Sequence, residues 1–289
     1  MIRVGRFDIF SVINGSIRLD GGGMFGIVPK VLWEKTEDVD AQNRILLATR
    51  TLVAIDRAER RVVIADAGAG GKWSEEEASR YAVRHAEWAV EGALGKHGIG
   101  PGDVTDVVVT HAHFDHCGGL TMWRDSPGGE TWLRFPRAVH WVHEDHWRHA
   151  LDPFERDAAS FLSRDLVGLD RSGMLRIIEG DDPSPPFEGM RWVVSHGHTP
   201  GLLLPLVEDA AAPLLFTGDM MPTSTHLSPL WVMAHDLEPL VTIEEKKRWT
   251  GACAGGLRFA FPHDRLVAGA VIDVSGRKPR IAAPLDLAP

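Results

Sequence analysis

The sequence predicts an α/β protein in which helices cover the outer faces of large β-sheets. Strand patterns outnumber helix patterns, both near the start of the chain and in its C-terminal third. Several of these strands end directly in turns that contain His or Asp. The 289 residues show neither linker composition nor internal repeats, so we expect residues 1–289 to form one domain.

The N-terminal segment contains the first predicted strands. Residues 7–13 roughly alternate apolar and polar side chains, and Asn14-Gly15 follows as a turn signal. We expect the three glycines at 21–23 to form a flexible stretch. Residues 46–55 and 62–65 are predicted to pair as strands across a charged turn.

Two helices are predicted from capping signals. Ser74 and Glu77 have the spacing of a capping box, and the helical pattern that follows extends to a C-terminal glycine at Gly98. Thr242 and Glu245 have the same spacing and predict a second helix start. Both helices would lie outside the sheets.

The segment from 125 to 190 has weaker patterns. Four histidines recur there at every third position: His140, His143, His146 and His149. A second metal site is one interpretation, but side chains three apart drift around a helix axis and do not converge on one ion. We therefore favour a strand that ends near Val142, followed by an exposed helix start. Residues 181–186 are predicted to form a loop.

Composition and charge narrow the classes of function. The net charge is −9, from 31 basic and 40 acidic residues, which argues against a nucleic-acid surface. We expect a small-molecule substrate and no nucleic-acid partner. The two cysteines, Cys117 and Cys253, form no disulfide framework and indicate a reducing compartment. The N-terminus has no secretory apolar run, and no segment is long enough to span a membrane. We expect a cytoplasmic protein, and a homodimer remains open.

The most informative motif is the six-residue run from His111 to His116, which follows the apolar strand 107–109. It places four metal-capable side chains at one strand end, but one strand end cannot surround a metal ion. Further candidate ligands each follow an apolar run of their own: His198, Asp219 and His263. We interpret the neighbouring Cys117 as a small buried hydrophobe.

These residue types suit two divalent ions. Imidazole and carboxylate donors bind zinc, and also iron, manganese or cobalt. His111 and His113 are two residues apart and point the same way in an extended segment. Asp219 has two oxygens and could bridge two ions, between which a trapped water would become a hydroxide nucleophile. Asp66 also follows a strand, and we interpret it as a structural or outer-shell carboxylate.

The combination of motifs resembles the metallo-β-lactamase superfamily. The matching stretches are His-x-His-x-Asp-His at 111–116, Gly-His-Thr-Pro-Gly around His198, Thr-Gly-Asp at Asp219, and His263. The resemblance implies an αββα sandwich with a dinuclear metal site at one edge. It also implies one metal held by His111, His113 and His198, and a second held by Asp115, His116 and His263. Asp219 would bridge the two.

A closer likeness is to the N-acyl-homoserine-lactone lactonases, the quorum-quenching branch. It is carried by residues 20–30, 32–33, 230–234 and 243–247. Two positions depart from that branch. Pro222 stands where such lactonases place a Tyr that polarises the substrate carbonyl, and the only Tyr is Tyr81. Leu202 follows Gly201 in place of a small polar residue or His.

Without that Tyr, the carbonyl electrophile would be a metal ion, His226 or His235. We favour the metal, with His235 as an accessory catalytic residue. Asp115, or the second metal, would assist the leaving alkoxide. Six apolar side chains are candidates for the substrate pocket: Met24, Phe25, Trp33, Met221, Trp231 and Met233.

The sequence therefore predicts a metal-dependent hydrolase of an ester or lactone. Phosphotriester or aryl-ester hydrolysis is an alternative at the same site, because the same hydroxide can attack phosphorus. A mononuclear iron dioxygenase is a second alternative, which would need only His111, His198 and Asp219. A non-catalytic member of the fold is a third, against which the complete ligand set argues.

Overall fold

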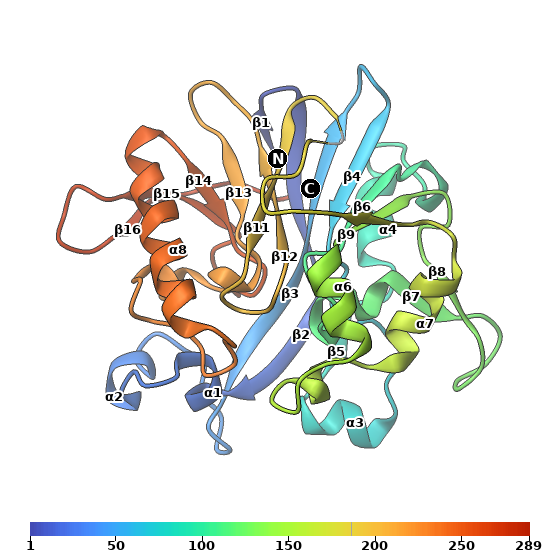
Figure 1. The fold of residues 1–289 in the computed structure, drawn as a ribbon, viewed down its shortest axis with the longest axis horizontal. Helices are drawn as coiled ribbons and strands as arrows, with labels where there is room; N and C mark the ends of the chain where they lie inside the picture. The colour runs from blue at the N-terminus through green and yellow to red at the C-terminus, as the bar shows by residue number, and fades with distance from the viewer. Residues whose placement is uncertain (186) are drawn as a thin grey trace.

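The computed structural model describes residues 1–185 and 187–289. Two β-sheets pack face to face, and helices cover the outer face of each (Figure 1). The αββα sandwich expected from the sequence is confirmed. Pro186, in the loop expected at 181–186, lies outside the described residues.

The first sheet combines antiparallel and parallel strands. Its order is β1-β2-β3-β4-β6-β9-β10, and β5 pairs with β2. The strands are β1 (Ile2–Val4), β2 (Phe7–Asp20), β3 (Arg44–Asp56), β4 (Arg61–Ala65), β5 (Arg84–His85), β6 (Asp106–Val108), β9 (Val139–His143) and β10 (Leu175–Ile178). Because β4, β6, β9 and β10 are parallel, their carboxyl ends lie at one edge of the sheet.

The second sheet has the order β11-β12-β13-β14-β15-β16. Its strands are β11 (Met190–Ser195), β12 (Leu202–Val207), β13 (Leu214–Phe216), β14 (Arg258–Ala260), β15 (Gly269–Asp273) and β16 (Arg280–Pro284). Here β13 and β14 are parallel, so the turns that follow them also share an edge. A separate hairpin pairs β7 (Thr121–Trp123) with β8 (Thr131–Leu133).

The helices occupy the outside of the sandwich and one end of it. Figure 1 shows α8 on the side of the second sheet and α4, α6 and α7 on the side of the first. The helices are α1 (Gly21–Phe25), α2 (Lys30–Trp33), α3 (Glu75–Arg80), α4 (Ala89–Gly95), α5 (Phe114–Cys117), α6 (Glu144–Leu151), α7 (Ser163–Arg171) and α8 (Pro239–Ala252). Within the described ranges, no helix combines the length and apolarity needed to cross a membrane.

Neighbouring residues of the central strands pack on opposite faces of each sheet. In β6, Val108 lies between the two sheets, whereas Val107 faces the helices outside. In β14, Ala260 lies between the sheets and Phe259 packs on the outer side. All four are fully or almost fully buried. Both faces of these strands are therefore covered, as their continuous apolar sequence requires.

Two local predictions in the N-terminal segment are wrong. Asn14-Gly15 is not a hairpin turn: β2 continues to Asp20, and the register with β3 shifts at this point as a bulge. The pairing of β2 with a long partner strand overrides the local turn signal. The glycines at 21–23 are helical and begin α1, because the Asp20 carboxylate accepts a hydrogen bond from the Gly23 amide (3.0 Å).

Of the two predicted helices, only the start of the first is placed correctly. The Ser74–Glu77 capping box is present and begins α3, but α3 ends at Arg80 instead of extending to Gly98. Ala82 and Trp88 have positive φ values of 47° and 61°, which interrupt the helix before α4. The second predicted start is also displaced, because α8 begins at Pro239, a residue suited to a first helical turn.

Candidate metal centre

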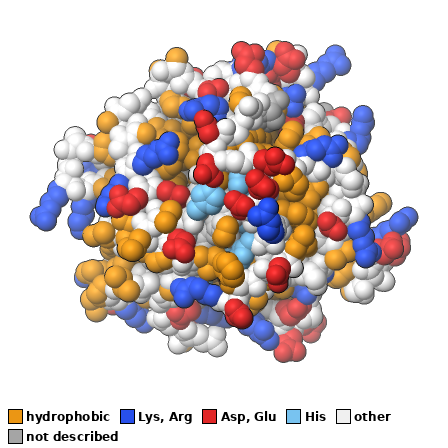
Figure 2. All heavy atoms as spheres, in the orientation of Figure 1, with side chains coloured by type: hydrophobic (Ala, Val, Ile, Leu, Met, Phe, Trp, Pro, Cys, Tyr) orange, Lys and Arg blue, Asp and Glu red, His pale blue; other side chains and the backbone are white. Residues whose placement is uncertain are grey.

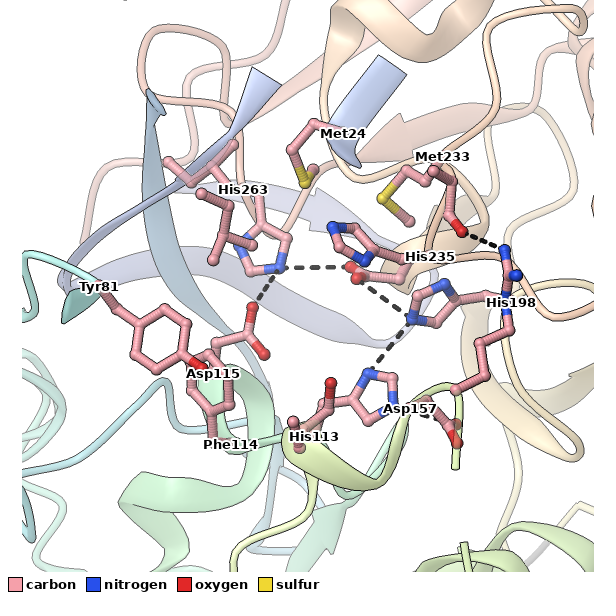
Figure 3. Close-up of a pocket in the computed structure, with 17 residues that line it drawn as sticks. Met24, Tyr81, His113, Phe114, Asp115, Asp157, His198, Met233, His235 and His263 are labelled. Carbon is pink, nitrogen blue, oxygen red and sulfur yellow. Dashed lines mark hydrogen bonds and ion pairs between the residues drawn. The ribbon is translucent and has the colours of Figure 1, made fainter. Parts of the chain in front are cut away.

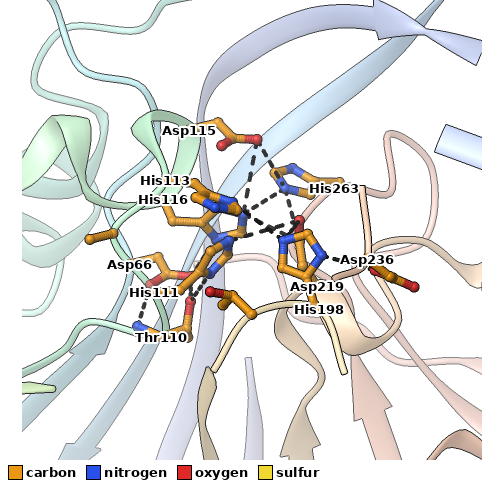
Figure 4. Close-up of polar contacts among 12 residues, drawn as sticks. Asp66, Thr110, His111, His113, Asp115, His116, His198, Asp219, Asp236 and His263 are labelled. Atoms are coloured by element: carbon orange, nitrogen blue, oxygen red, sulfur yellow. Dashed lines mark hydrogen bonds and ion pairs between the residues drawn. The ribbon is translucent and has the colours of Figure 1, made fainter. Parts of the chain in front are cut away.

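Seven side chains from four turns meet at the shared carboxyl edge of the two sheets (Figure 4). The turn after β6 and the start of α5 supply four of them, and the turns after β11, β13 and β14 supply one each. The seven are His111, His113, Asp115, His116, His198, Asp219 and His263, and none is more than 8% exposed. The structure thus brings together the whole set that the sequence singled out.

The donor atoms form two groups. In the first, those of His111, His113 and His198 lie within 4.8 Å of one another, with His198 Nε2 3.3 Å from His113 Nδ1. In the second, those of Asp115, His116 and His263 meet the same limit. There, His263 Nε2 lies 2.9 Å from His116 Nε2 and 3.5 Å from the Asp115 carboxylate.

Asp219 lies between the two groups, on the short turn after β13. Its Oδ2 is 3.5 Å from His198 Nε2 and 4.0 Å from His111 Nε2. Its Oδ1 is 3.2 Å from His116 Nε2 and 3.3 Å from His263 Nε2. One carboxylate oxygen therefore faces each group, which is the arrangement of a bridging ligand.

The chemistry of this cluster fits divalent cations. Within the described residues, His111 Nε2 and Asp219 Oδ1 are buried and have no hydrogen-bond partner. Burial opposes charge on His116, yet the Asp219, Asp115 and Asp66 carboxylates outweigh it and raise the pKa of His116 well above its usual value. The buried carboxylates thus favour positive charge among the imidazoles. Nitrogen and oxygen donors in this ratio suit zinc, iron, manganese or cobalt.

Each imidazole of the cluster has a polar group behind it, near its outer nitrogen. The Asp66 carboxylate lies 2.8 Å from His116 Nδ1, and the Asp236 carboxylate lies 2.9 Å from His198 Nδ1. The other outer hydrogen bonds join His263 to the Ala48 carbonyl (2.7 Å) and His111 to the Thr110 hydroxyl (3.1 Å), whereas the Asp157 carboxylate near His113 lies 3.9 Å away, beyond hydrogen-bond distance. Such partners fix the tautomer and orientation of a metal ligand.

Of these partners, sequence reasoning found Asp66 and missed Asp236 and Asp157. Asp66 directly follows β4 and lies in the left-handed region (φ 58°), and its carboxylate accepts hydrogen bonds from the backbone amide and hydroxyl of Thr110. It therefore holds the turn after β6 as well as His116. Asp236 follows His235 in a segment without secondary structure, so no periodic pattern marked it.

A cavity of about 520 Å³ opens onto the donor cluster (Figure 3). Figure 2 shows histidines at the centre of this face, with acidic and apolar side chains around them. Five members of the cluster line the cavity: His113, Asp115, His198, Asp219 and His263. The wall also contains apolar side chains, namely Leu19, Met24, Leu47, Phe114 and Met233.

The predicted substrate residues divide into two sets. Met24 and Met233 lie in the cavity wall. The others do not belong to the lining: Phe25, Trp33 and Trp231 pack behind it, with Phe25 stacked on Trp33 at 5.1 Å, and Met221 lies in the core outside the second sheet. The expectation that all six face the substrate is wrong, because the larger rings form the apolar support of the wall.

Several lining residues were not anticipated. Tyr81 lies in the wall, although it comes from the end of α3 and not from the turn after Asp219. Its ring packs on Phe114 with centroids 4.9 Å apart. The segment after α6 contributes Arg156 and Asp157, and the Arg156 guanidinium donates a hydrogen bond to the Ala234 carbonyl (2.6 Å). This segment lay where sequence patterns were weakest.

The two candidate accessory histidines, His235 and His226, differ in their surroundings. His235 lines the cavity, and burial lowers its pKa. His226 is fully buried with both ring nitrogens engaged, by the Thr223 hydroxyl (2.7 Å) and the Met24 carbonyl (2.8 Å). His226 therefore supports the wall, and only His235 is placed to contact a substrate.

The histidines of the weakly patterned segment lie behind the cluster. The strand β9 ends at His143, close to the expected position. The first residues of the helix that follows, Glu144 and Asp145, are partly exposed, whereas His146 and His149 are buried. His146 Nε2 accepts a hydrogen bond from the Ala112 amide (2.6 Å), and His149 Nε2 lies 2.8 Å from Asp157. His146 thus supports the turn that carries His111 and His113, and His149 supports Asp157 in the cavity wall. The helix start is thus partly exposed, close to the expectation, but the histidines of α6 are buried because their side of the helix packs against the sandwich.

The chain matches the model of the metallo-beta-lactamase superfamily over residues 51–248. The chain belongs to this superfamily. A human protein, metallo-beta-lactamase domain-containing protein 1, is 39% identical over 70 residues, which are 24% of this chain and 21% of the human protein. The match to that relative is therefore local.

Solved structures share the whole fold. A probable metal-dependent hydrolase from Staphylococcus aureus is 30% identical, with 98% of each chain covered and a TM-score of 0.87. A dizinc quorum-quenching lactonase, AidC, is 17% identical, with 98% of this chain and 96% of that one covered and a TM-score of 0.77. An N-acyl homoserine lactone hydrolase with its product bound at the catalytic metal centre has a TM-score of 0.67, at 17% identity over 91% and 95% of the two chains.

The fold, the family and the donor cluster together define a metal-dependent hydrolase of the metallo-beta-lactamase superfamily.

Proposed function

We propose that this hydrolase opens lactones of the N-acyl-homoserine-lactone class, using two zinc ions. The observation that carries the proposal is the pair of donor groups joined by Asp219 at the floor of a cavity with an apolar wall. A volume of about 520 Å³ suits a small molecule, and Met24, Met233 and Leu19 offer an apolar surface to an acyl chain. The lactonase names of two structural neighbours agree with this substrate class.

Each of the two donor groups would bind one metal ion. His111, His113 and His198 would hold one, and Asp115, His116 and His263 the other, with Asp219 between them. When bound, such ions lower the pKa of water and polarise a carbonyl group. The outer partners Asp66 and Asp236 keep His116 and His198 oriented, so the donors are prearranged for this task.

The protein's own side chains handle the proton and the substrate. Asp115 lines the cavity, and its carboxylate takes the proton released by the attacking water and returns it to the ring oxygen that leaves as an alcohol. His235 is neutral near pH 7, because burial lowers its pKa, and its single N–H can donate to the lactone carbonyl. The apolar wall excludes water from the acyl side of the substrate.

A substrate panel tests the proposal directly. The purified protein, loaded with zinc, is assayed against N-acyl-homoserine lactones of different chain lengths, simple alkyl and aryl esters, and aryl phosphotriesters. We expect lactone turnover with a higher kcat/KM than for the open-chain esters. Turnover of phosphotriesters or aryl esters without any lactone turnover would replace the proposal with the alternative reaction.

The second donor group argues against the iron dioxygenase. A mononuclear site would use His111, His198 and Asp219, yet Asp115, His116 and His263 are assembled just as closely. Elemental analysis separates the two. About two metal ions per chain are expected for the hydrolase, and about one iron per chain would favour oxygen chemistry.

We also propose a cytoplasmic location for the protein. Cys117 and Cys253 are both buried free thiols, which is typical of a reducing compartment. Fractionation of the producing cells checks this, and recovery of the protein in the extracellular medium would contradict it.

A further inference from the structure

Helix α8 turns an unusual face toward the rest of the molecule. A surface helix normally buries an apolar stripe. The buried residues of α8 are instead Thr242, Lys246 and Thr250, which are polar and recur every four positions. Lys246 is 0% exposed, although a fully buried lysine is rare unless it has a partner. The inner face of this helix therefore serves contacts other than apolar packing.

Lys246 holds the segment that forms part of the cavity wall. Its ammonium donates a hydrogen bond to the Trp231 carbonyl (2.6 Å). Two residues further along the chain is Met233, and then come His235 and Asp236, which line the cavity or contact a ligand histidine. Burial lowers the pKa of Lys246 to about 7, against the opposing charge of Asp236. The hydrogen bond of a fully buried lysine to this carbonyl indicates a positional role.

Glu245, the preceding residue, holds the turn that carries His198. One of its carboxylate oxygens accepts a hydrogen bond from the Ser195 hydroxyl (2.6 Å), and the other accepts from the His196 amide (3.0 Å). The turn also packs closely on α8, because a Cβ at Gly197 would lie 2.3 Å from the Thr242 hydroxyl oxygen. The start of the His198 turn is thus fixed to the helix.

The two segments that α8 holds also contact each other at His198. The Leu237 amide donates to the His198 carbonyl (3.1 Å), and the Glu238 amide donates to the Gly197 carbonyl (2.8 Å). Asp236 supports the His198 ring from behind. A shift of either segment relative to α8 would therefore change the ligand and the cavity wall together.

We propose that Glu245 and Lys246 are positioning residues, through which α8 sets the orientation of His198 and the width of the acyl side of the cavity. Glu245 acts on the metal-ligand turn, and Lys246 acts on the wall. The second part rests on the proposed lactonase function, because it concerns how the acyl chain is bound. The first part concerns metal binding alone.

The neighbours of these residues provide matched controls. Glu244 and Lys247 lie on the same helix, carry the same charges and pair with each other at the surface (2.6 Å). The test compares Glu245→Ala and Lys246→Met with Glu244→Ala and Lys247→Met. Folding is checked by circular dichroism and Tm, zinc affinity by chelator competition, and the wall by KM for lactones with long and short acyl chains.

We expect Glu245→Ala and Lys246→Met to change different quantities, the first zinc affinity and the second KM. Glu245→Ala should weaken zinc binding by about 10-fold or more, as the loss of support behind a ligand does. Lys246→Met should leave zinc affinity nearly unchanged, because the metal site keeps Asp236. It should raise the ratio of KM for long-chain lactones to KM for short-chain lactones by about 10-fold, because the wall loses the hydrogen bond that holds it. The controls should match the wild type in both readouts.

Several results would overturn the proposal. It fails if the inner variants lower Tm but keep the wild-type zinc affinity and KM ratio, since the helix would then be merely structural. If Glu245→Ala does not fold, Glu245→Gln keeps one acceptor oxygen and should weaken zinc binding by about threefold. If the wild type opens no lactone, the proposed function fails, yet the zinc measurement still decides the role of Glu245.

Discussion

The metal ligands are held by carboxylates that do not face the cavity. Asp66 and Asp236 each contact the outer nitrogen of a ligand histidine. Asp66 also accepts from the Thr110 amide of a neighbouring turn, and Asp236 from the Met233 amide of its own segment. Each therefore fixes a ring and a backbone segment at once. The histidine run at 111–116 was visible in sequence because its spacing is restrictive, and Asp66 was recognised because it follows a strand. Asp236 follows no strand and has no spacing pattern to recognise.

Asp66→Asn should weaken metal binding without unfolding the protein. The amide keeps the size of the side chain but removes the negative charge behind His116, so zinc affinity should fall by about 10- to 100-fold. Chelator competition measures this. Asp106→Asn is the control, because Asp106 is equally buried but pairs with Arg61 and Trp141, away from the cluster. Equal zinc affinities in the two variants would contradict the role of Asp66.

Asp115→Asn and His116→Ala should each abolish hydrolysis. Asp115 is both a donor of the second group and the proposed carrier of the proton, and His116 contacts Asp219 as well as Asp66. We expect His116→Ala to retain about one zinc per chain and less than about 1% of the wild-type kcat, because the water is no longer activated between two ions. Near-normal turnover by either variant would refute the assignment.

At the scale of elements, strand ends were easier to predict than helix ends. The parallel strands β4 and β6, and β13 and β14, bring their following turns together, so apolar runs followed by His or Asp located the site. Helix boundaries failed where backbone geometry overrode the pattern, as at Trp88. The helical state of the glycines in α1 could not be predicted either, because a glycine triplet indicates flexibility when its packing partners are unknown.

Gly23→Ala should perturb the substrate site and leave the metal site intact. A Cβ at Gly23 would lie 2.6 Å from His235 Nε2, so the imidazole must move, whereas the helical backbone accepts alanine well. We expect KM for lactones to rise about 10-fold with unchanged zinc content, because His235 loses its position. Steady-state kinetics and elemental analysis measure both.

The control for this substitution is Gly92→Ala in α4. A Cβ there meets nothing within 4 Å, so the variant should be stabilised by about 1 kcal/mol with unchanged kinetics. Unaltered KM in Gly23→Ala would show that His235 does not contact the substrate.

At the scale of the whole molecule, the sandwich and its ligand edge followed from the sequence, but the cavity wall did not. Arg156 and Asp157 come from the segment after α6, and Tyr81 comes from the end of α3. These segments are distant in sequence and lack regular patterns. Only the packing of both sheets and their covering helices places them around one cavity.

Global stability should depend on pH through Lys246. Its pKa is about 7 in the folded protein and near 10.5 when exposed, so the unfolded chain binds more protons between these values. Stability from this residue is therefore lowest below pH 7 and rises toward pH 10.5. Urea unfolding of wild type and Lys246→Met from pH 6 to 10 measures it. The wild type should gain stability relative to the variant as pH rises, and parallel curves would contradict a buried ammonium.

The central claim is that seven side chains from four turns surround two metal ions. Anomalous scattering at the zinc edge, from crystals of the zinc-loaded protein, tests it most directly. We expect two peaks, each about 2.0–2.2 Å from the donor atoms of one group, with Asp219 between them. A single peak, or peaks bound to other residues, would contradict the account.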